Sequence, residues 1–199
     1  MDLQTEHPTP LEQKDKLEFK KCIVALIGPP LVGKSTLGTE ISKESNFVYL
    51  DIDQIRQDLF NHPTEQRLAP DQEAFAMITS YQKIFELARN TLAKGEPVLL
   101  AATYSKKIGH EMLRQLAQIS GSPLKVFLLV NSNEDEIRSR LKLRAQGKSL
   151  SNIRNFQDLK DAQQRYEKIK GVDFAEIDTN NPISNCKNKI FEFLSAYKI

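Results

Sequence analysis

Residues 28–36 constrain the fold of this chain more than any other segment, because they read Gly-Pro-Pro-Leu-Val-Gly-Lys-Ser-Thr. They match the pattern G-x-x-x-x-G-K-[ST] in full, and such a match is informative when a strand precedes it and a helix follows it. The apolar run 22–27 predicts a buried strand before the motif, and residues 34–44 predict a helix after it. This order of strand, loop and helix predicts an α/β fold with a phosphate-binding loop.

The chemistry of the motif follows from this arrangement. Backbone N–H groups and a helix N-terminus that point at one place bind phosphate oxygens. Gly28 and Gly33 suit tight bends that a side chain would obstruct; Lys34 would reach the β- and γ-phosphates, and Ser35 would bind Mg²⁺. The residues expected to bind a nucleoside triphosphate in this loop are Gly28, Pro29, Pro30, Val32, Gly33, Lys34, Ser35 and Thr36. The alternative, an ordinary glycine turn after a core strand, does not explain the full motif and both flanks.

Strand-like and helix-like segments alternate along the rest of the chain. Further strands are expected at 47–52, 97–102, 124–130 and 173–178, and helices at 53–60, 71–94, 105–120, 132–145 (capped by Ser132) and 156–170, with one more near the C-terminus. Apolar strands without alternation, separated by helices, predict a parallel sheet covered on both faces. Residues 1–17 are polar and contain two prolines, so we expect a flexible leader followed by a single domain at 18–199.

Composition excludes several classes of protein. The formal net charge of +2 is too small to imply nucleic-acid binding by itself. Two cysteines provide neither a disulfide framework nor a metal-ligand spacing. No apolar run reaches the roughly 18 residues of a membrane span, and no signal peptide is evident. We therefore expect a soluble, cytoplasmic protein with no membrane partner.

Two aspartates follow the second expected strand. Ligands of parallel sheets bind outside the carboxyl ends of the strands, which is where Asp51 and Asp53 lie. Being two residues apart, they point the same way in an extended chain. Phosphoryl transfer to a hydroxyl needs a carboxylate that orients the hydroxyl and accepts its proton. Arg56 is a neighbour of Asp53 if Asp53 opens a helix; the alternative is that Asp53 is only a helix N-cap.

A block of positive charge lies farther along the chain. Between Ile137 and Gln157 there is no acidic residue, and the basic residues are Arg138, Arg140, Lys142, Arg144, Lys148 and Arg154. Guanidinium groups held over a phosphoryl group stabilise the charge that builds up on it. The block adjoins a polar stretch suited to closing over a site, which predicts a lid near residues 138–155. The alternative is a solvated basic face of a helix.

These features occur in an order that resembles one group of P-loop kinases. The features are the phosphate-binding loop, the Asp-Ile-Asp-Gln-Ile-Arg segment at 51–56, Ala-Thr-Tyr at 102–104 and the arginine-rich helix. The group contains polynucleotide 5′-hydroxyl kinases, zeta-toxin-type kinases and chloramphenicol phosphotransferase, and is of the AAA_33 type of ATP-binding protein. The resemblance implies a three-layer P-loop NTPase fold with a five-stranded parallel sheet of order 2-3-1-4-5 and helices on both faces.

The resemblance also implies roles for individual residues. Asp53 would activate the acceptor hydroxyl, Arg56 would contact the acceptor, and the lid arginines would neutralise the transferring phosphoryl. The expected catalytic residues are Lys34, Asp53, Arg140 and Arg144, with Arg140 also contacting the nucleotide. The expected acceptor-binding residues are Asp51, Asp53, Arg56, Thr103 and Tyr104, although Tyr104 could equally be a core residue. Ser35 and Asp51 are the expected ligands of Mg²⁺.

One position departs from the pattern of this group. Many relatives carry an aspartate at the end of the third strand, where this chain has Leu-Ala-Ala-Thr at 100–103. Two functions therefore stay open. The favoured one transfers the γ-phosphoryl of ATP, with Mg²⁺, to a hydroxyl of an unidentified acceptor, a small molecule being preferred over a nucleic-acid 5′ end. The other is an ATP-binding switch or degenerate kinase without significant transfer.

Overall fold

The computed structural model describes residues 16–60, 69–146, 153, 155–164, 166–167 and 169–196. Within these residues strands and helices alternate, as expected. The elements are β1 (Ile23–Ile27), α1 (Lys34–Glu44), β2 (Val48–Asp51), α2 (Ile52–Phe60), α3 (Pro70–Ala93), β3 (Val98–Ala101), α4 (Lys107–Ser120), β4 (Leu124–Val130), α5 (Glu134–Gln146), α6 (Phe156–Gln164), β5 (Phe174–Asp178) and α7 (Ile183–Ala196). The largest difference in bounds is at α6, which ends at Gln164 instead of 170. Most of the expected leader, residues 1–15, lies outside the described residues.

The strands form one parallel sheet in the order β2-β3-β1-β4-β5. This confirms the three-layer fold and the strand order that the resemblance implies. All five residues of β1 are apolar and buried, which suits a strand with a neighbour on each side and helices on each face. In the pairing of β2 with β3, Asp51 lies opposite Ala101. The carboxyl ends of β1, β2 and β3 therefore meet at one edge of the sheet.

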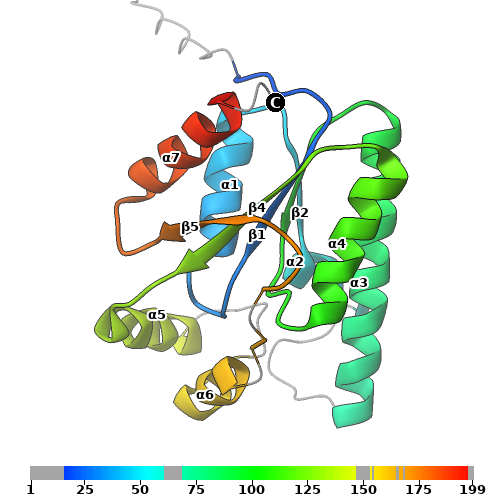
Figure 1. The fold of residues 1–199 in the computed structure, drawn as a ribbon. Coiled ribbons are helices and arrows are strands. Elements are labelled where there is room, and N and C mark those ends of the chain that lie inside the picture. Colours follow the sequence, from blue (N-terminus) through cyan, green and yellow to red (C-terminus); the bar gives the residue numbers. More distant parts are fainter. Residues whose placement is uncertain are drawn as a thin grey trace, which may run out of the picture.

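Alternate residues of each strand enter two hydrophobic cores. Val24 and Leu26 pack with α1 and α7, whereas Ile23, Ala25 and Ile27 pack with α2, α3 and α4. Figure 1 shows α1 and α7 on one side of the sheet and α3 and α4 on the other. A third cluster joins the phosphate-binding loop to α5 and α6 and consists of Leu31, Ile137, Leu141 and Leu159, with Ile153 and Phe156 against it. α5, which carries the first part of the expected lid, and α6 thus pack on the loop through apolar contacts.

The start of α5 differs from the expectation. The helix begins at Glu134, and the side-chain oxygen of Asn133 accepts hydrogen bonds from the backbone N–H groups of Asp135 and Glu136, each at 3.1 Å. An N-cap side chain satisfies N–H groups of the first turn in this way. Asn133 therefore caps α5, and the expected cap at Ser132 is wrong by one residue.

Glu167 ties the segment after α6 to the start of α4. Its carboxylate accepts a hydrogen bond from the backbone N–H of Lys107 at 2.9 Å and pairs with the amine of Lys106 at 3.1 Å. Its own backbone N–H donates to the carbonyl of Ser105 at 2.8 Å. The hydrogen bond from Lys107, followed by that from Lys106, holds the pKa of Glu167 below its ordinary value. Glu167 thus supplies the N-terminal cap of α4 from a position 60 residues away.

Neither cysteine is paired, and both are buried. Burial raises the pKa of Cys22 to about 12, as expected for a small core residue directly before β1. Among the described helices, none combines the length and the apolar character needed to cross a membrane.

Candidate active site

The phosphate-binding loop connects β1 to α1 through backbone conformations that favour glycine. Gly28 has φ 142° and Gly33 has φ 92°. A Cβ atom on Gly28 would lie 2.4 Å from the carbonyl oxygen of Leu129, so a side chain would force β1 and β4 apart. The motif therefore encodes both a backbone shape and a close approach of two strands.

The N-terminus of α1 opens directly onto this loop. Gly33 is its N-cap in the left-handed conformation, and no side chain caps the helix. The first N–H groups of a helix lack partners within the helix, and they carry the positive end of its dipole. The amine of Lys34 donates to the carbonyls of Gly28 and Pro29, both at 2.8 Å, which places its charge across the mouth of the loop. This arrangement suits an anion, above all a phosphate.

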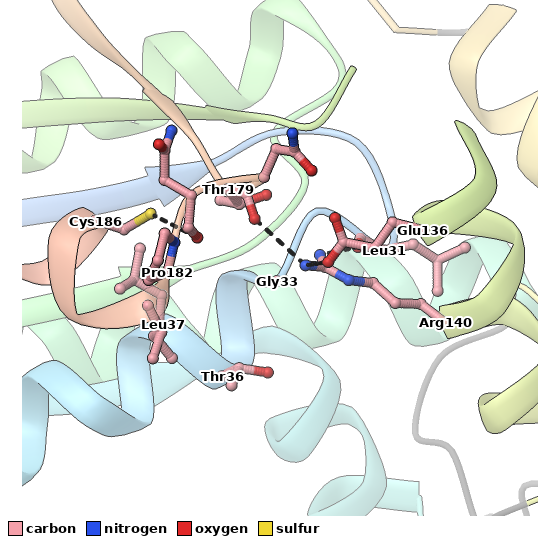
Figure 2. A pocket seen from close by; sticks show the side chains of 12 residues that line it. Leu31, Gly33, Thr36, Leu37, Glu136, Arg140, Thr179, Pro182 and Cys186 are labelled. Carbon is pink, nitrogen blue, oxygen red and sulfur yellow. Dashed lines mark hydrogen bonds and ion pairs between the residues drawn. The ribbon is translucent and has the colours of Figure 1, made fainter. Parts of the chain in front are cut away.

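A pocket of about 650 Å³ adjoins the loop. Its walls come from the loop and α1, from α5, from the turn that joins β5 to α7, and from the start of α7. The lining residues are Leu31, Gly33, Thr36, Leu37, Glu136, Arg140, Thr179, Asn180, Asn181, Pro182, Ile183 and Cys186. Figure 2 shows Arg140 reaching across the pocket from α5 toward Leu31 and Thr179. Apolar and polar side chains both line this pocket, and a cavity of this size is typical of a small-molecule site.

Arg140 joins three parts of the pocket. Its guanidinium donates to the carbonyl of Leu31 at 3.0 Å, to Glu136 at 2.5 Å and to the carbonyl of Thr179 at 3.4 Å. A hydrogen bond from Asn131, and then the contact with Arg140, keep the pKa of Glu136 below its ordinary value. The carboxylate stays ionised at neutral pH and holds the guanidinium beside the phosphate-binding loop.

The other lid arginines are placed differently. Arg138 is two residues before Arg140 on α5, so it points in another direction. Its guanidinium lies 4.2 Å from the ring centre of Phe156 and 3.7 Å from Glu134. The side chain of Arg144 lies outside the described residues, as does the lid segment 147–152. Of the arginines in α5 whose side chains are described, Arg140 is the one that reaches the pocket.

Asp51 and Asp53 meet through the start of α2 and not through a shared extended strand. Asp51 ends β2, and its Oδ1 accepts a hydrogen bond from the backbone N–H of Asp53 at 2.9 Å. Asp53 therefore stands in the first turn of α2 and is not its N-cap, because Asp51 serves that role. Oδ1 of Asp53 accepts a hydrogen bond from Arg56 at 2.8 Å. Asp51 accepts a second hydrogen bond at its Oδ2, from the hydroxyl of Tyr49 at 2.8 Å.

The end of β3 places its two candidate residues in different surroundings. Thr103 is partly exposed, whereas Tyr104 is 1% exposed and has a left-handed φ of 46°. Its N–H donates to the hydroxyl of Tyr81 at 3.3 Å, and its carbonyl is 2.8 Å from Nε2 of His110. The ring packs against Tyr81 with centroids 5.6 Å apart. The expectation that Tyr104 binds the acceptor is therefore wrong, and Tyr104 is a core residue, as the alternative had it.

The turn after β5 belongs to the pocket but was not among the expected site residues. Residues 179–182 read Thr-Asn-Asn-Pro and follow a strand whose carboxyl end lies beside the pocket. The rule that ligands bind at the carboxyl ends of parallel strands applies to β5 as it does to β2. The sequence alone offered that rule as a signal, but no motif distinguished this turn from any other.

Comparison with known proteins agrees with this fold. The family model AAA_33, described as an AAA domain, matches residues 23–169. No curated protein matches the chain.

Several solved kinases superpose on most of the chain. A gluconokinase from Sinorhizobium meliloti 1021 has a TM-score of 0.65 and 16% identity, covering 89% of this chain and 94% of its own. An unliganded sugar kinase from Janibacter sp. HTCC2649 has a TM-score of 0.63 and 13% identity, and the match covers 88% of this chain and 95% of the kinase. The APS kinase CysC of Mycobacterium tuberculosis, in complex with AMPPNP and APS, has a TM-score of 0.61 and 16% identity, and the match covers 88% of this chain and 98% of CysC. At these identities the likeness shows a shared fold.

Proposed function

Because this chain belongs to the AAA_33 family of AAA domains, we propose that it is a P-loop kinase that uses ATP and Mg²⁺ to phosphorylate a hydroxyl of a small molecule. One observation carries the proposal. The phosphate-binding loop after β1, the Asp53–Arg56 pair after β2 and Arg140 of α5 lie at the carboxyl edge of one parallel sheet. Such a site can hold a nucleotide on one side and an acceptor on the other.

The residues of the loop fit the phosphates of a nucleotide. Val32, Gly33, Lys34, Ser35 and Thr36 have backbone N–H groups that can donate to phosphate oxygens. Pro29 and Pro30 have no N–H, so they shape the loop without donating. When phosphates enter, the Lys34 amine can exchange its two carbonyl partners for phosphate oxygens, which as charged acceptors bind it more strongly.

The donor set also fits Mg²⁺, which would neutralise phosphate charge when bound. Mg²⁺ keeps several waters and uses phosphate oxygens with one or two protein oxygens, so it needs no cage of protein ligands. No cluster of three His, Cys, Asp or Glu residues that could hold a metal occurs in the part of the chain that the structure describes. The exposed hydroxyl of Ser35, in the first turn of α1, and the carboxylate of Asp51 are the oxygens that we assign to the ion.

Asp51 stands beside the position where many relatives carry the missing acid. The register of β2 and β3 places it opposite Ala101, at the same level of the sheet edge. Its two oxygens each accept one hydrogen bond, from Tyr49 and from the Asp53 N–H. A carboxylate can accept about four hydrogen bonds, so lone pairs remain for the ion. We infer that Asp51 replaces the absent strand-three carboxylate.

The acceptor side is assigned to Asp53, Arg56 and Thr103. Asp53 would orient the hydroxyl and accept its proton as the phosphoryl group arrives. The Asp53 side chain is 32% exposed, so an acceptor can reach it. The Arg56 side chain is 12% exposed, and its guanidinium pairs with Oδ1 of Asp53 at 2.8 Å. Arg140, and Arg144 by its place four residues farther along α5, would neutralise the transferring phosphoryl. The pocket beside Thr179–Pro182 would hold the base of the nucleotide.

The structural neighbours favour a small acceptor. Among them are a sugar kinase, a gluconokinase and a kinase bound to APS. The rival function is an ATP-binding switch without significant transfer. It is favoured by the absence of an acid in Val98–Ala101 and the two residues that follow it.

The test measures Mg²⁺-dependent ATP consumption across a panel of hydroxyl acceptors. The panel contains sugars, sugar acids, nucleosides, sugar nucleotides, antibiotics and nucleic-acid 5′ ends. Asp53→Asn should lower stimulated turnover by about 10²–10⁴-fold and leave ATP affinity near that of the wild type. Asp58→Asn is the matched control, because Asp58 is exposed on the same helix and accepts a hydrogen bond from Gln54 of that helix. Tight ATP binding with no stimulation by any acceptor would favour the switch, and normal turnover of Asp53→Asn would refute the role of Asp53.

A further inference from the structure

Tyr49 connects the phosphate-binding side of the site to the acceptor side. It lies in β2 two residues before Asp51, so the two side chains leave the strand on the same face. Its ring packs against α1 at Gly38, where a Cβ atom would come within 2.4 Å of the ring. Its hydroxyl is 2.8 Å from Oδ2 of Asp51 and 3.4 Å from the carbonyl oxygen of Ser35. No role assigned above uses this side chain.

The Tyr49 hydroxyl donates to Asp51. It lies 2.8 Å from Oδ2, and a carboxylate oxygen can only accept, so the phenol is the donor of this hydrogen bond. A phenol has one proton to donate, and of its two acceptors the carboxylate is both nearer and charged. Hydrogen bonds to ionised acceptors are about twice as strong as neutral ones.

The contact continues from Asp51 into α2. The second oxygen of Asp51 accepts the backbone N–H of Asp53 at 2.9 Å, and Asp53 in turn accepts Arg56 at 2.8 Å. With one oxygen held by Tyr49 and the other by α2, the Asp51 carboxylate has a fixed plane. That plane fixes the first turn of α2, and this turn carries the Asp53 side chain.

We propose that Tyr49 is a positioning residue of this site: its hydroxyl fixes the Asp51 carboxylate, and through it the first turn of α2 and Asp53. The kinetic part of this inference rests on the proposed function, since it assumes that Asp53 orients the acceptor. Misplacing a catalytic group by about 1 Å can cost up to about 10²-fold in rate. Losing one hydrogen bond of two on Asp51 should therefore lower kcat by about tenfold, with the KM for ATP nearly unchanged.

The experiment is a double-mutant cycle with two independent measurements. Tyr49→Phe keeps the ring and removes the hydroxyl, and Asp51→Ala removes its acceptor. Tyr166→Phe is the matched control, because it removes a buried hydroxyl that has no hydrogen-bond partner in the described part of the chain. The first measurement is hydrogen exchange of the Asp53 amide by NMR. The second is Mg²⁺-dependent ATP consumption with the acceptor panel.

We expect Tyr49→Phe to speed exchange of the Asp53 amide by about tenfold, near the lower end of the effect of losing a hydrogen bond to a charged group. We expect kcat to fall as stated, and neither effect to appear when Tyr49→Phe is added to Asp51→Ala. Tyr166→Phe should match the wild type in both measurements.

Three results would overturn the inference. Unchanged Asp53 exchange in Tyr49→Phe would show that the hydroxyl does not hold α2. Equal effects of Tyr49→Phe in the presence and absence of the Asp51 carboxylate would show that the Tyr49 hydroxyl does not act through Asp51. Faster exchange with an unchanged kcat would reduce Tyr49 to a structural residue. A wild-type protein that consumes no ATP would refute the proposed function, and the exchange cycle would still decide whether Tyr49 holds α2 through Asp51.

Discussion

The Gly38→Ala substitution tests the close packing of α1 against β2. A Cβ atom at this position would lie 2.4 Å from Cε2, 2.6 Å from Cζ and 2.8 Å from the hydroxyl oxygen of Tyr49. Cβ atoms do not approach other heavy atoms so closely, so either the Tyr49 ring or α1 must move. Movement of the ring also breaks its 2.8 Å hydrogen bond to Asp51.

The magnitude follows from three opposing effects. Alanine in place of glycine inside a helix favours folding by about 1 kcal/mol. Overpacking of a dense interior costs about 1–3 kcal/mol, and loss of a hydrogen bond to a charged group costs about 1.5–3 kcal/mol. The free energy of unfolding of Gly38→Ala should therefore fall by between about 1.5 and 5 kcal/mol.

Urea denaturation followed by circular dichroism measures this free energy, and a second variant supplies the control. In a Tyr49→Ala background the ring is absent, so Gly38→Ala should change sign and stabilise the protein by about 1 kcal/mol. Equal destabilisation in both backgrounds would refute the reasoning, because the cost would then not arise from Tyr49.

Three further predictions concern charged side chains. Lys34→Ala should abolish tight ATP binding in a calorimetric titration, because the loop loses its fixed positive charge; retained affinity would contradict the assignment of the loop. Arg140→Ala should lower stimulated turnover more than ATP affinity, whereas Lys142→Ala, on an exposed part of the same helix, should match the wild type; equal losses would indicate a general charge effect. The hydrogen bond from Lys107 lowers the folded-state pKa of Glu167 below the ordinary 4.5. The ionised Glu167 carboxylate therefore stabilises the fold above about pH 4.5, and this stabilisation is lost as the pH falls through the folded-state pKa. Glu167→Gln should therefore make thermal stability less dependent on pH below about pH 5, and an unchanged acid profile would contradict this.

Much of the fold could be predicted because its causes are local. An apolar strand without alternation needs cover on both faces, and Leu124–Val130 has the expected bounds. The two glycines of the phosphate-binding loop adopt the positive φ values that their type permits at low cost, so this motif specifies its conformation within a few residues. The strand order required more, and was inferred from a family resemblance.

Other features were not readable because they depend on which elements pack together. Asp53 was expected in an extended chain or as a cap, but the helix starts one residue earlier and Asp51 became the cap. Tyr104 is buried because α3 and α4 cover the end of β3, and nothing in its neighbouring residues shows this. The position of the turn at 179–182 beside the pocket could not be predicted for the same reason, because it arises from the pairing of β4 with β5.

The sequence by itself determined a loop between a strand and a helix whose backbone suits a phosphate-like anion, since backbone conformation and dipole direction are set by adjacent residues. Only the tertiary structure decided that Arg140 faces this loop while Arg138 faces Phe156. Both arginines belong to the same charged block, and their sequence context is nearly the same. The direction of each was decided by the way α5 docks its apolar residues on Leu31, a residue more than 100 positions away.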